Sequence, residues 1–356
     1  MGTQIMNMLK IGYWPLSNNL KAAGDRRRLV FWANARGHQV VTDQNQNIDV
    51  IVASENSDFN SGYFSNRKVP VILDLVDAYL SPLNALDDFA RGMAKKISGQ
   101  IGGSLKPFSH HIRDFCIDAD AVICSSIEQK EVIEIFCANT HVILDSHDEI
   151  PFLSPQATRV EIDTKRLILW EGQPATIRGV QNISKALSEL TKTNELHFNF
   201  VTDERYFQFM NKFFVRNTLE VLKRDLDNIS DLISIIPWTP DNLVAIAKQS
   251  HVAMIPIDLS VPMQRLKPEN RLLIMWRLGL PCLTSPSPAY SRVAREAGVD
   301  SNCIEPEDWV ENFNRLLSDP VFSHTEIVRG QNYLRENHNR NLLLTKWDKV
   351  FESVVG

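Results

Sequence analysis

A loop in the second half of the chain concentrates cationic side chains at the start of an apolar helix. Arg265, Lys267 and Arg271 surround the first turn of this helix, and Asn270 adds a neutral hydrogen-bonding group. Free backbone N–H groups and fixed cations together favour an anion, because each contributes charge-assisted hydrogen bonds. The pattern predicts a site for a diphosphate that is held without a metal.

A second loop, 170–179, follows an apolar run and opens another helix. Gly172 permits close approach of a ligand to the backbone, and Arg178 supplies a permanent positive charge. This loop is a candidate phosphate site, with a merely solvated Arg178 as the alternative.

The first half of the chain offers a different chemistry in the loop 22–28. Gly24 and Asp25 precede Arg26, so a carboxylate stands beside a cation at a helix start. Asp25 is a candidate general base facing an acceptor, and Gly24 and Arg26 are candidate acceptor-side residues. A helix cap is the common alternative for an aspartate at this position.

Two further candidates end strand-like runs in the first half. Asp77 follows 71–75 and can position or deprotonate an acceptor hydroxyl, although a helix cap or a loop salt bridge is the alternative. His147 follows 141–145 and is a candidate acceptor-side residue. No second histidine lies at helical spacing from it, so we expect no metal site, and no G-x-G-x-x-G follows the first strand, so no dinucleotide cofactor is expected.

These loops are positioned by apolar runs that alternate with helix-length amphipathic stretches, which predicts parallel sheets covered on both faces. The alternation pauses in a Pro- and Ser-containing stretch at 149–158 and then restarts. We therefore expect an α/β protein of two facing, doubly wound Rossmann-like domains, with ligands in the cleft between them. The expected parts are 1–155, 160–325 and terminal helices 326–356 that pack back toward the first domain. The expected elements include one helix over 25–35 and a long helix near 206–224.

Composition narrows the class of protein. The 356 residues carry a formal charge of −5, which disfavours a nucleic-acid-coating protein. Five cysteines without C-x-x-C spacing, no spanning apolar run and no leader pattern favour a cytoplasmic protein. The segment 91–113 is basic and amphipathic, which is compatible with an anionic membrane surface, although a solvated helix face is commoner.

In these motifs the chain resembles family 4-like glycosyltransferases of the GT-B fold. The resemblance rests on 167–172 with Arg178-Gly179, on 250–256, and on 267–271 through Gly279-Leu-Pro281. It implies a nucleotide-diphosphate sugar donor held by Gly172, Arg178, Lys267, Asn270 and Arg271. It also implies a glycan or lipid-linked acceptor, no cofactor and no metal.

The sequence departs from that family at three positions. Gln173 replaces a usual arginine, and Leu266 and Ile274 stand where many retaining members have a Glu-x7-Glu pair. We therefore expect an inverting displacement with Asp25, or second Asp77, as the general base. A nucleotide-sugar 2-epimerase, with Glu269 and Glu296 as its candidate acids, and a non-catalytic nucleotide-sugar-binding protein are the alternatives.

Overall fold

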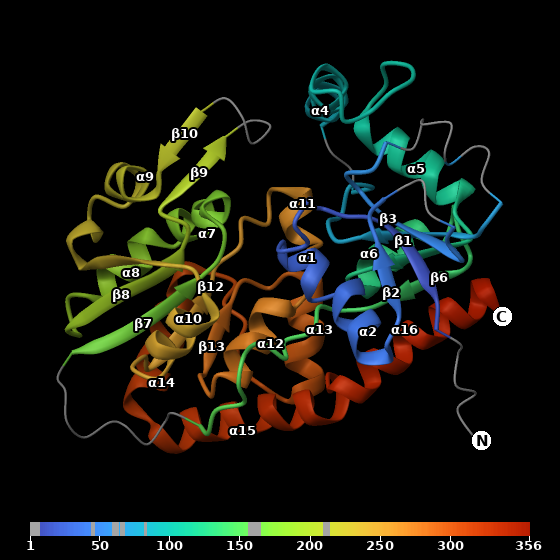
Figure 1. Cartoon of the computed structure of the whole chain (residues 1–356). Helices are drawn as coiled ribbons and strands as arrows, with labels where there is room; N and C mark the ends of the chain where they lie inside the picture. The colour runs from blue at the N-terminus through green and yellow to red at the C-terminus, as the bar shows by residue number, and fades with distance from the viewer. Residues whose placement is uncertain are drawn as a thin grey trace. The chain divides into compact units, whose positions relative to one another are not determined.

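The computed structural model describes residues 8–43, 47–58, 64, 68–81, 84–155, 165–208 and 214–356. The chain divides into two compact units, of which unit 1 comprises 1–146 with 340–356 and unit 2 comprises 147–339. Each unit is built on its own parallel sheet (Figure 1). The fold is therefore the α/β class of two Rossmann-like domains, as the alternation of strands and helices predicts.

The sheet of unit 1 has the strand order β2-β1-β3-β4-β5-β6. Its strands are β1 (Lys10–Trp14), β2 (Gln39–Val41), β3 (Val50–Ser54), β4 (Val71–Leu75), β5 (Ala121–Cys124) and β6 (Thr140–Val142). Its helices are α1 (Ala23–Arg26), α2 (Leu29–Arg36), α4 (Ala85–Ile97), α5 (Phe108–Asp118), α6 (Ile127–Ile133) and α16 (Arg340–Val355). The helix expected over 25–35 is therefore divided into α1 and α2, which are separated by Arg27 and Arg28.

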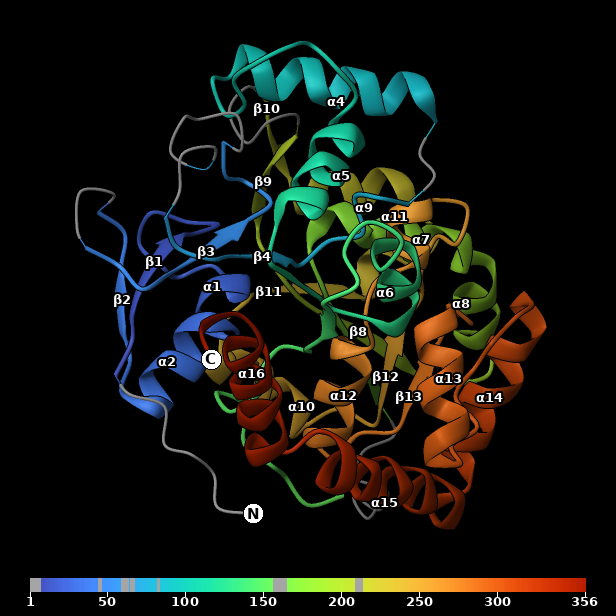
Figure 2. The ribbon, with the colours of Figure 1, turned by 90° about the vertical axis from the view of Figure 1, so that its right-hand side faces the viewer.

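Side chains alternate across the sheet of unit 1 and build a core on each face. Val50 and Val52 face the core that α2 and α16 cover, whereas Ile51 and Ala53 face the core under α5. In that first core Trp32 of α2 stacks on Phe351 of α16, with ring centroids 4.1 Å apart. Figure 2 shows α16 beside α2. Helix α16 therefore completes the core on one face of the first sheet.

The sheet of unit 2 has the order β11-β8-β7-β12-β13, and an antiparallel hairpin lies outside it. The strands are β7 (Arg166–Glu171), β8 (Leu196–Thr202), β9 (Arg205–Gln208), β10 (Phe214–Asn217), β11 (Ile233–Pro237), β12 (Val252–Ile255) and β13 (Cys282–Thr284). The hairpin pairs β9 with β10, so the long helix expected near 206–224 is wrong. Among the described residues of this range only the end is helical, where the Asn217 side chain caps α9 (Thr218–Asp225).

Helices cover both faces of the second sheet. They are α7 (Ile177–Asn182), α8 (Ser184–Leu190), α10 (Pro240–Ala247), α11 (Pro262–Arg265), α12 (Asn270–Arg277), α13 (Pro288–Ala297), α14 (Pro306–Ser318) and α15 (Pro320–Asn337). Side chains of α7, α8 and α14 pack on Ile168, Trp170 and Phe200 of the strands. On the other face, α10 and α12 contact β7, β8 and β12.

The stretch that joins the units packs in unit 2. The Gln331 side chain of α15 donates to the carbonyls of Leu153 and Trp276, at 2.8 and 3.0 Å. A Cβ on Gly279 would lie 2.3 Å from the Ser154 carbonyl oxygen, so only glycine allows this approach. Residues 147–155, expected in the first domain, therefore belong with the second, as does α15, while α16 belongs to unit 1.

Candidate functional site

The sheet of unit 2 reverses its strand order between β7 and β12. From β7 the chain adds β8 and β11 on one side, whereas β12 and β13 lie on the other. Ligands of doubly wound sheets bind beyond the carboxyl ends of the strands at such a reversal. Here those ends are Glu171 and Ile255, which directs the search for a site to the loops that follow them.

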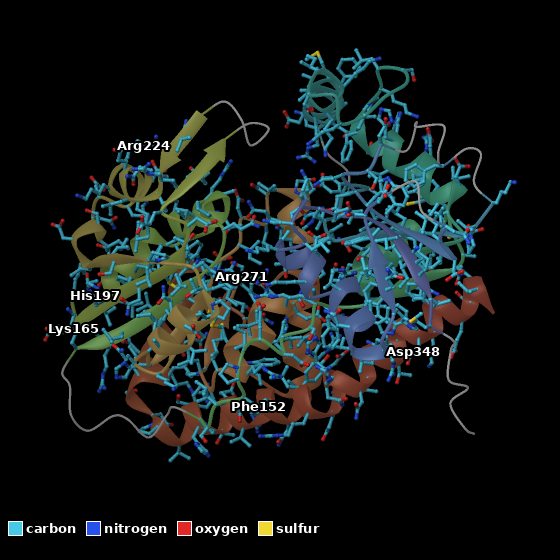
Figure 3. All side chains as sticks on the ribbon, in the orientation of Figure 1. Phe152, Lys165, His197, Arg224, Arg271 and Asp348 are labelled. Atoms are coloured by element: carbon cyan, nitrogen blue, oxygen red, sulfur yellow. The ribbon has the colours of Figure 1, made fainter. Side chains whose placement is uncertain are left out.

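The loop after β7 contacts the first turn of α12. The Arg271 guanidinium donates to the backbone carbonyl of Glu171, and its Nε lies 3.4 Å from Glu171 Oε2. A Cβ on Gly172 would lie 3.0 Å from Arg271 Nη2. The structure therefore brings Gly172 and Arg271, which is labelled in Figure 3, together. Arg271 also lies over the Trp170 ring, 5.5 Å from its centroid.

The loop after β12 holds a carboxylate against the second predicted cation. Asp258 is buried, and its Oδ2 lies 2.7 Å from Nε of Arg178, whose side chain is 64% exposed. The Ser260 backbone N–H and hydroxyl donate to the other oxygen of Asp258, at 3.1 and 2.6 Å. Cations that gather to bind an anion repel one another and are expected to lack counter-ions within the protein. This expectation is wrong for Arg178 and Arg271, because Asp258 and Glu171 pair with them.

The start of α12 supplies the remaining predicted donor-side groups. Asn270 opens the helix, and its Oδ1 is buried without a hydrogen-bond partner in the described part of the chain. Lys267 is half-buried three residues earlier. That Arg178, Lys267 and Arg271 converge on one anion stays a prediction.

A tight backbone contact and a side-chain hydrogen bond fix this loop cluster. A Cβ on Gly179 would lie 2.2 Å from the Pro256 carbonyl oxygen, so glycine lets α7 press against the chain after β12. The Trp238 indole donates to Glu171 Oε1 at 2.9 Å, which holds that carboxylate at the end of β7. Sequence reasoning passed over Glu171 and Asp258 as functional residues, although both follow the two strands that flank the order reversal.

The two acids proposed for an epimerase are held in ion pairs and hydrogen bonds. Glu269 is buried, and its carboxylate oxygens lie 3.3 and 3.4 Å from Nη2 of Arg292. Glu296 lies 4.0 Å from the same guanidinium and accepts from the Tyr333 hydroxyl at 3.1 Å. Their arrangement is that of a network linking α12, α13 and α15.

In unit 1 the predicted base Asp25 is fully buried. One of its oxygens accepts from the Tyr13 hydroxyl at 2.7 Å and from the Leu16 backbone N–H at 2.8 Å. The other accepts from the backbone N–H and the hydroxyl of Ser17, at 3.0 and 2.6 Å. This geometry argues against a general base, because both oxygens are committed to fastening the loop after β1.

The neighbours of Asp25 also differ from expectation. Gly24 is buried, and a Cβ there would lie 2.4 Å from Leu16 Cδ1, so this glycine serves internal packing and leaves no room for an acceptor. The Arg26 guanidinium donates to the Lys21 carbonyl at 2.9 Å. His147 is buried in unit 2, where its ring lies 4.6 Å from that of His338.

Asp77 remains the other candidate for the general base. It follows β4 and is half-buried. Beside it lies Glu55, a carboxyl missed by sequence reasoning, which is 4% exposed and accepts from the Val76 backbone N–H at 3.2 Å. Burial, together with the charge of Asp77, raises the pKa of Glu55 to about 8.

Groups of three or more His, Cys, Asp or Glu side chains that could hold a metal ion are absent from the described residues. Likewise, none of the helices in this part of the chain is long and apolar enough to span a bilayer.

No family model matches the sequence, and no curated protein matches it. Solved structures do match its fold. HepE of Anabaena, solved with UDP and glucose, is 12% identical, with a TM-score of 0.63 over 97% of this chain and 100% of HepE. WaaG, a glycosyltransferase involved in lipopolysaccharide biosynthesis, is 11% identical, with a TM-score of 0.56 over 98% of this chain and 100% of WaaG.

A third similar structure is TarM, which is 11% identical with a TM-score of 0.58 over 85% of this chain. The match covers 54% of TarM, so the chain spans about half the length of that protein. These similarities establish that the chain has the GT-B fold.

Proposed function

We propose that the chain is a glycosyltransferase that moves a sugar from a nucleotide-diphosphate donor to a glycan or lipid-linked acceptor, without a metal. The observation that carries the proposal is the cluster of cations, glycine and helix start at the strand-order reversal of unit 2. The similarity to HepE, which was solved with UDP and glucose, supports the same choice of donor. A lipid-linked acceptor would place the enzyme at the periphery of a cytoplasmic, anionic membrane surface.

In this proposal the donor diphosphate replaces Asp258 and Glu171 as the ion-pair partner of Arg178 and Arg271. Arg178 lies at the surface, so it can turn from Asp258 to a phosphate without unfolding anything. Arg271 is held over Trp170 and presents a fixed guanidinium, which suits bidentate binding of an anion. Lys267 and the first N–H groups of α12 add positive potential, and Asn270 Oδ1 is able to accept a hydrogen bond from a sugar hydroxyl.

We propose Asp77 as the residue that accepts the acceptor proton in an inverting displacement. It is the half-buried carboxylate at the end of a central strand of unit 1, whereas Asp25 has no accessible oxygen. Arg26 is at the surface of the same unit and is the proposed contact for an anionic acceptor group.

The decisive experiment is to incubate the protein with a panel of nucleotide sugars and to measure release of nucleotide diphosphate with and without acceptors. Acceptor-dependent release supports a transferase, release of an epimerised sugar nucleotide supports a 2-epimerase, and binding without turnover supports the non-catalytic alternative.

Variants then test the assigned residues. Arg178→Ala and Lys267→Ala should each weaken nucleotide binding about tenfold to a hundredfold, since a charge-assisted hydrogen bond contributes about 1.5–3 kcal/mol. Arg224→Ala is the matched control, because this arginine is 62% exposed and pairs with Asp225 away from the loops of the site. Asp77→Asn should lower turnover by about 10²–10⁴ with nucleotide affinity kept. Unchanged affinity in both cation variants would refute the donor site.

A further inference from the structure

Helix α4 of unit 1 has its polar side toward the protein and its apolar side toward solvent. Four large apolar residues of this 13-residue helix are exposed: Leu86 by 78%, Phe89 by 41%, Met93 by 41% and Ile97 by 77%. At 100° per residue they fall within about 80° of the helix circumference, so they form one continuous line. We call this line the α4 stripe.

The opposite side of α4 is fastened to the rest of unit 1 by polar groups. Asp88 is buried and accepts from the backbone N–H of Ser109 at 3.1 Å as well as from its hydroxyl. Lys95 Nζ donates to Asn56 at 3.1 Å and lies over the Phe108 ring, 4.4 Å from its centroid. The free energy of folding therefore gains little from Leu86 and Ile97, which stay mostly in water, and only part of what Phe89 and Met93 could contribute.

A short loop extends the α4 stripe on one side. A Cβ on Gly92 would lie 2.1 Å from the Lys106 carbonyl oxygen, which shows that the loop before α5 lies directly against α4. Lys96 donates to the Gly103 carbonyl of this loop at 2.5 Å. Leu105 of the same loop is 46% exposed and so widens the apolar surface.

The charge of this region is opposite to that of the chain. Residues 84–114 carry five Lys or Arg and three Asp, a formal charge of +2, whereas the whole chain carries −5. Asp114 pairs with Lys106 and Arg113, Asp88 is buried, and Lys96 is exposed beside the stripe. An apolar line bordered by cations suits a bilayer with anionic headgroups, which takes up both kinds of group.

The exposed area disfavours a protein partner. The exposed fractions of the four stripe residues and Leu105 together amount to fewer than three whole side chains. At about 150–250 Å² for a large side chain, this area stays below the roughly 800 Å² per partner that a stable protein interface buries. A membrane needs no such area, because charge and insertion of a few side chains act together.

We propose that the α4 stripe inserts into the surface of an anionic phospholipid bilayer, with Lys96 at the headgroups. This proposal rests on the proposed function in one respect: binding to the bilayer would bring unit 1 to an acceptor that is anchored there by its lipid. Donor binding by unit 2 does not depend on it.

The test is flotation of the full chain with vesicles of phosphatidylcholine, with and without phosphatidylglycerol. The wild type should float with the anionic vesicles and be released by salt, because screening weakens the headgroup attraction. The double variant Leu86→Ser/Ile97→Ser should lower the partition coefficient at least about tenfold, given about 1.5–3 kcal/mol for burying each side chain. Lys96→Glu should lower it about fivefold or more.

The matched control is Ile135→Ser/Val321→Ser, whose residues are each 77% exposed and lie outside the region. This control should bind vesicles as the wild type does. The proposal is overturned if the wild type does not bind anionic vesicles at low salt, or if the control loses as much binding as the stripe variant. It is also overturned if the wild type does not bind vesicles but self-associates, and the stripe variant does not. The α4 stripe would then be covered by a second copy of the chain.

Nucleotide affinity of the same variants, measured by calorimetry, separates this proposal from the proposed function. The stripe variant should keep the wild-type affinity while losing the membrane. A wild type that binds vesicles but no nucleotide would refute the proposed function and leave the membrane proposal standing.

Discussion

Arg28 is the residue whose replacement should damage unit 1 most. Its guanidinium is fully buried, with Nη2 2.6 Å from Asp74 Oδ1, Nε 3.0 Å from Asp74 Oδ2 and Nη1 3.3 Å from Asp145. Nη1 also donates to the Ile143 carbonyl at 2.7 Å. Burial alone would lower the pKa of Arg28, but Asp74 and Asp145 raise it above the ordinary value, so the group is a permanent cation.

Arg28→Met would remove the buried counter-ion of Asp74 and the ion pair with Asp145. Breaking a buried ion pair by removing one partner costs about 3–5 kcal/mol, which corresponds to a 10²–10³-fold or larger rise in local opening. We expect hydrogen exchange to accelerate by this factor in β4, while peptides of β7 and β8 in unit 2 exchange as in the wild type.

The control is Arg36→Met, which removes a 38% exposed arginine from its pair with Asp348 and should cost about 1 kcal/mol or less. The double variant Arg28→Met/Asp74→Leu should recover part of the loss, because an apolar side chain removes one stranded charge. If the free energy of hydrogen exchange in β4 of Arg28→Met lies within about 1 kcal/mol of the wild-type value, the ion-pair network does not hold these strands together.

Two further predictions concern stability and the site. Glu55 keeps its proton up to about pH 8, whereas an unfolded chain loses it near pH 4.5. The folded protein therefore binds more protons in this window, and its stability must fall as pH rises through it. Glu55→Gln should remove this fall, so unfolding free energies at pH 5 and pH 8.5 should diverge between wild type and variant by a few kcal/mol, and parallel curves would contradict the reasoning. Gly179→Ala should lower stability by about 1–3 kcal/mol, because its methyl group meets the Pro256 carbonyl. Gly172→Ala should cost less, since its methyl meets side-chain atoms of Arg271 and Thr176 at 3.0 Å rather than a backbone carbonyl; equal melting temperatures for the two variants would count against this account.

The periodicity of apolar residues predicted the two parallel sheets because fully buried strands such as 121–124 are continuous apolar runs in the sequence. The same reasoning failed at 206–224, where local helix propensity competes with strand pairing that no single segment reveals. Nor does the sequence alone reveal the role of Arg28. Its partners Asp74 and Asp145 lie 46 and 117 residues away in the chain, and only the crossing of the strands brings them to it.

The donor loops were easier to find than their counter-ions. Gly172, Arg178 and Arg271 have a signal in their own neighbourhood, namely glycine and cations at helix starts. Asp258 and Glu171 carry no such local signal, because a carboxylate after a strand is commonplace. Their significance comes from the strand order, which sets β12 beside β7.

The position of α16 sets the order in which the chain is able to fold on the ribosome. Leu343, Trp347 and Phe351 belong to the core of the first sheet, yet they are synthesised after all of unit 2. Unit 2 is one continuous stretch and has its whole core as soon as residue 339 has emerged. The unit that synthesis begins first is therefore the last to be completed, and until then the α2 face of its sheet stays open to water and to chaperones.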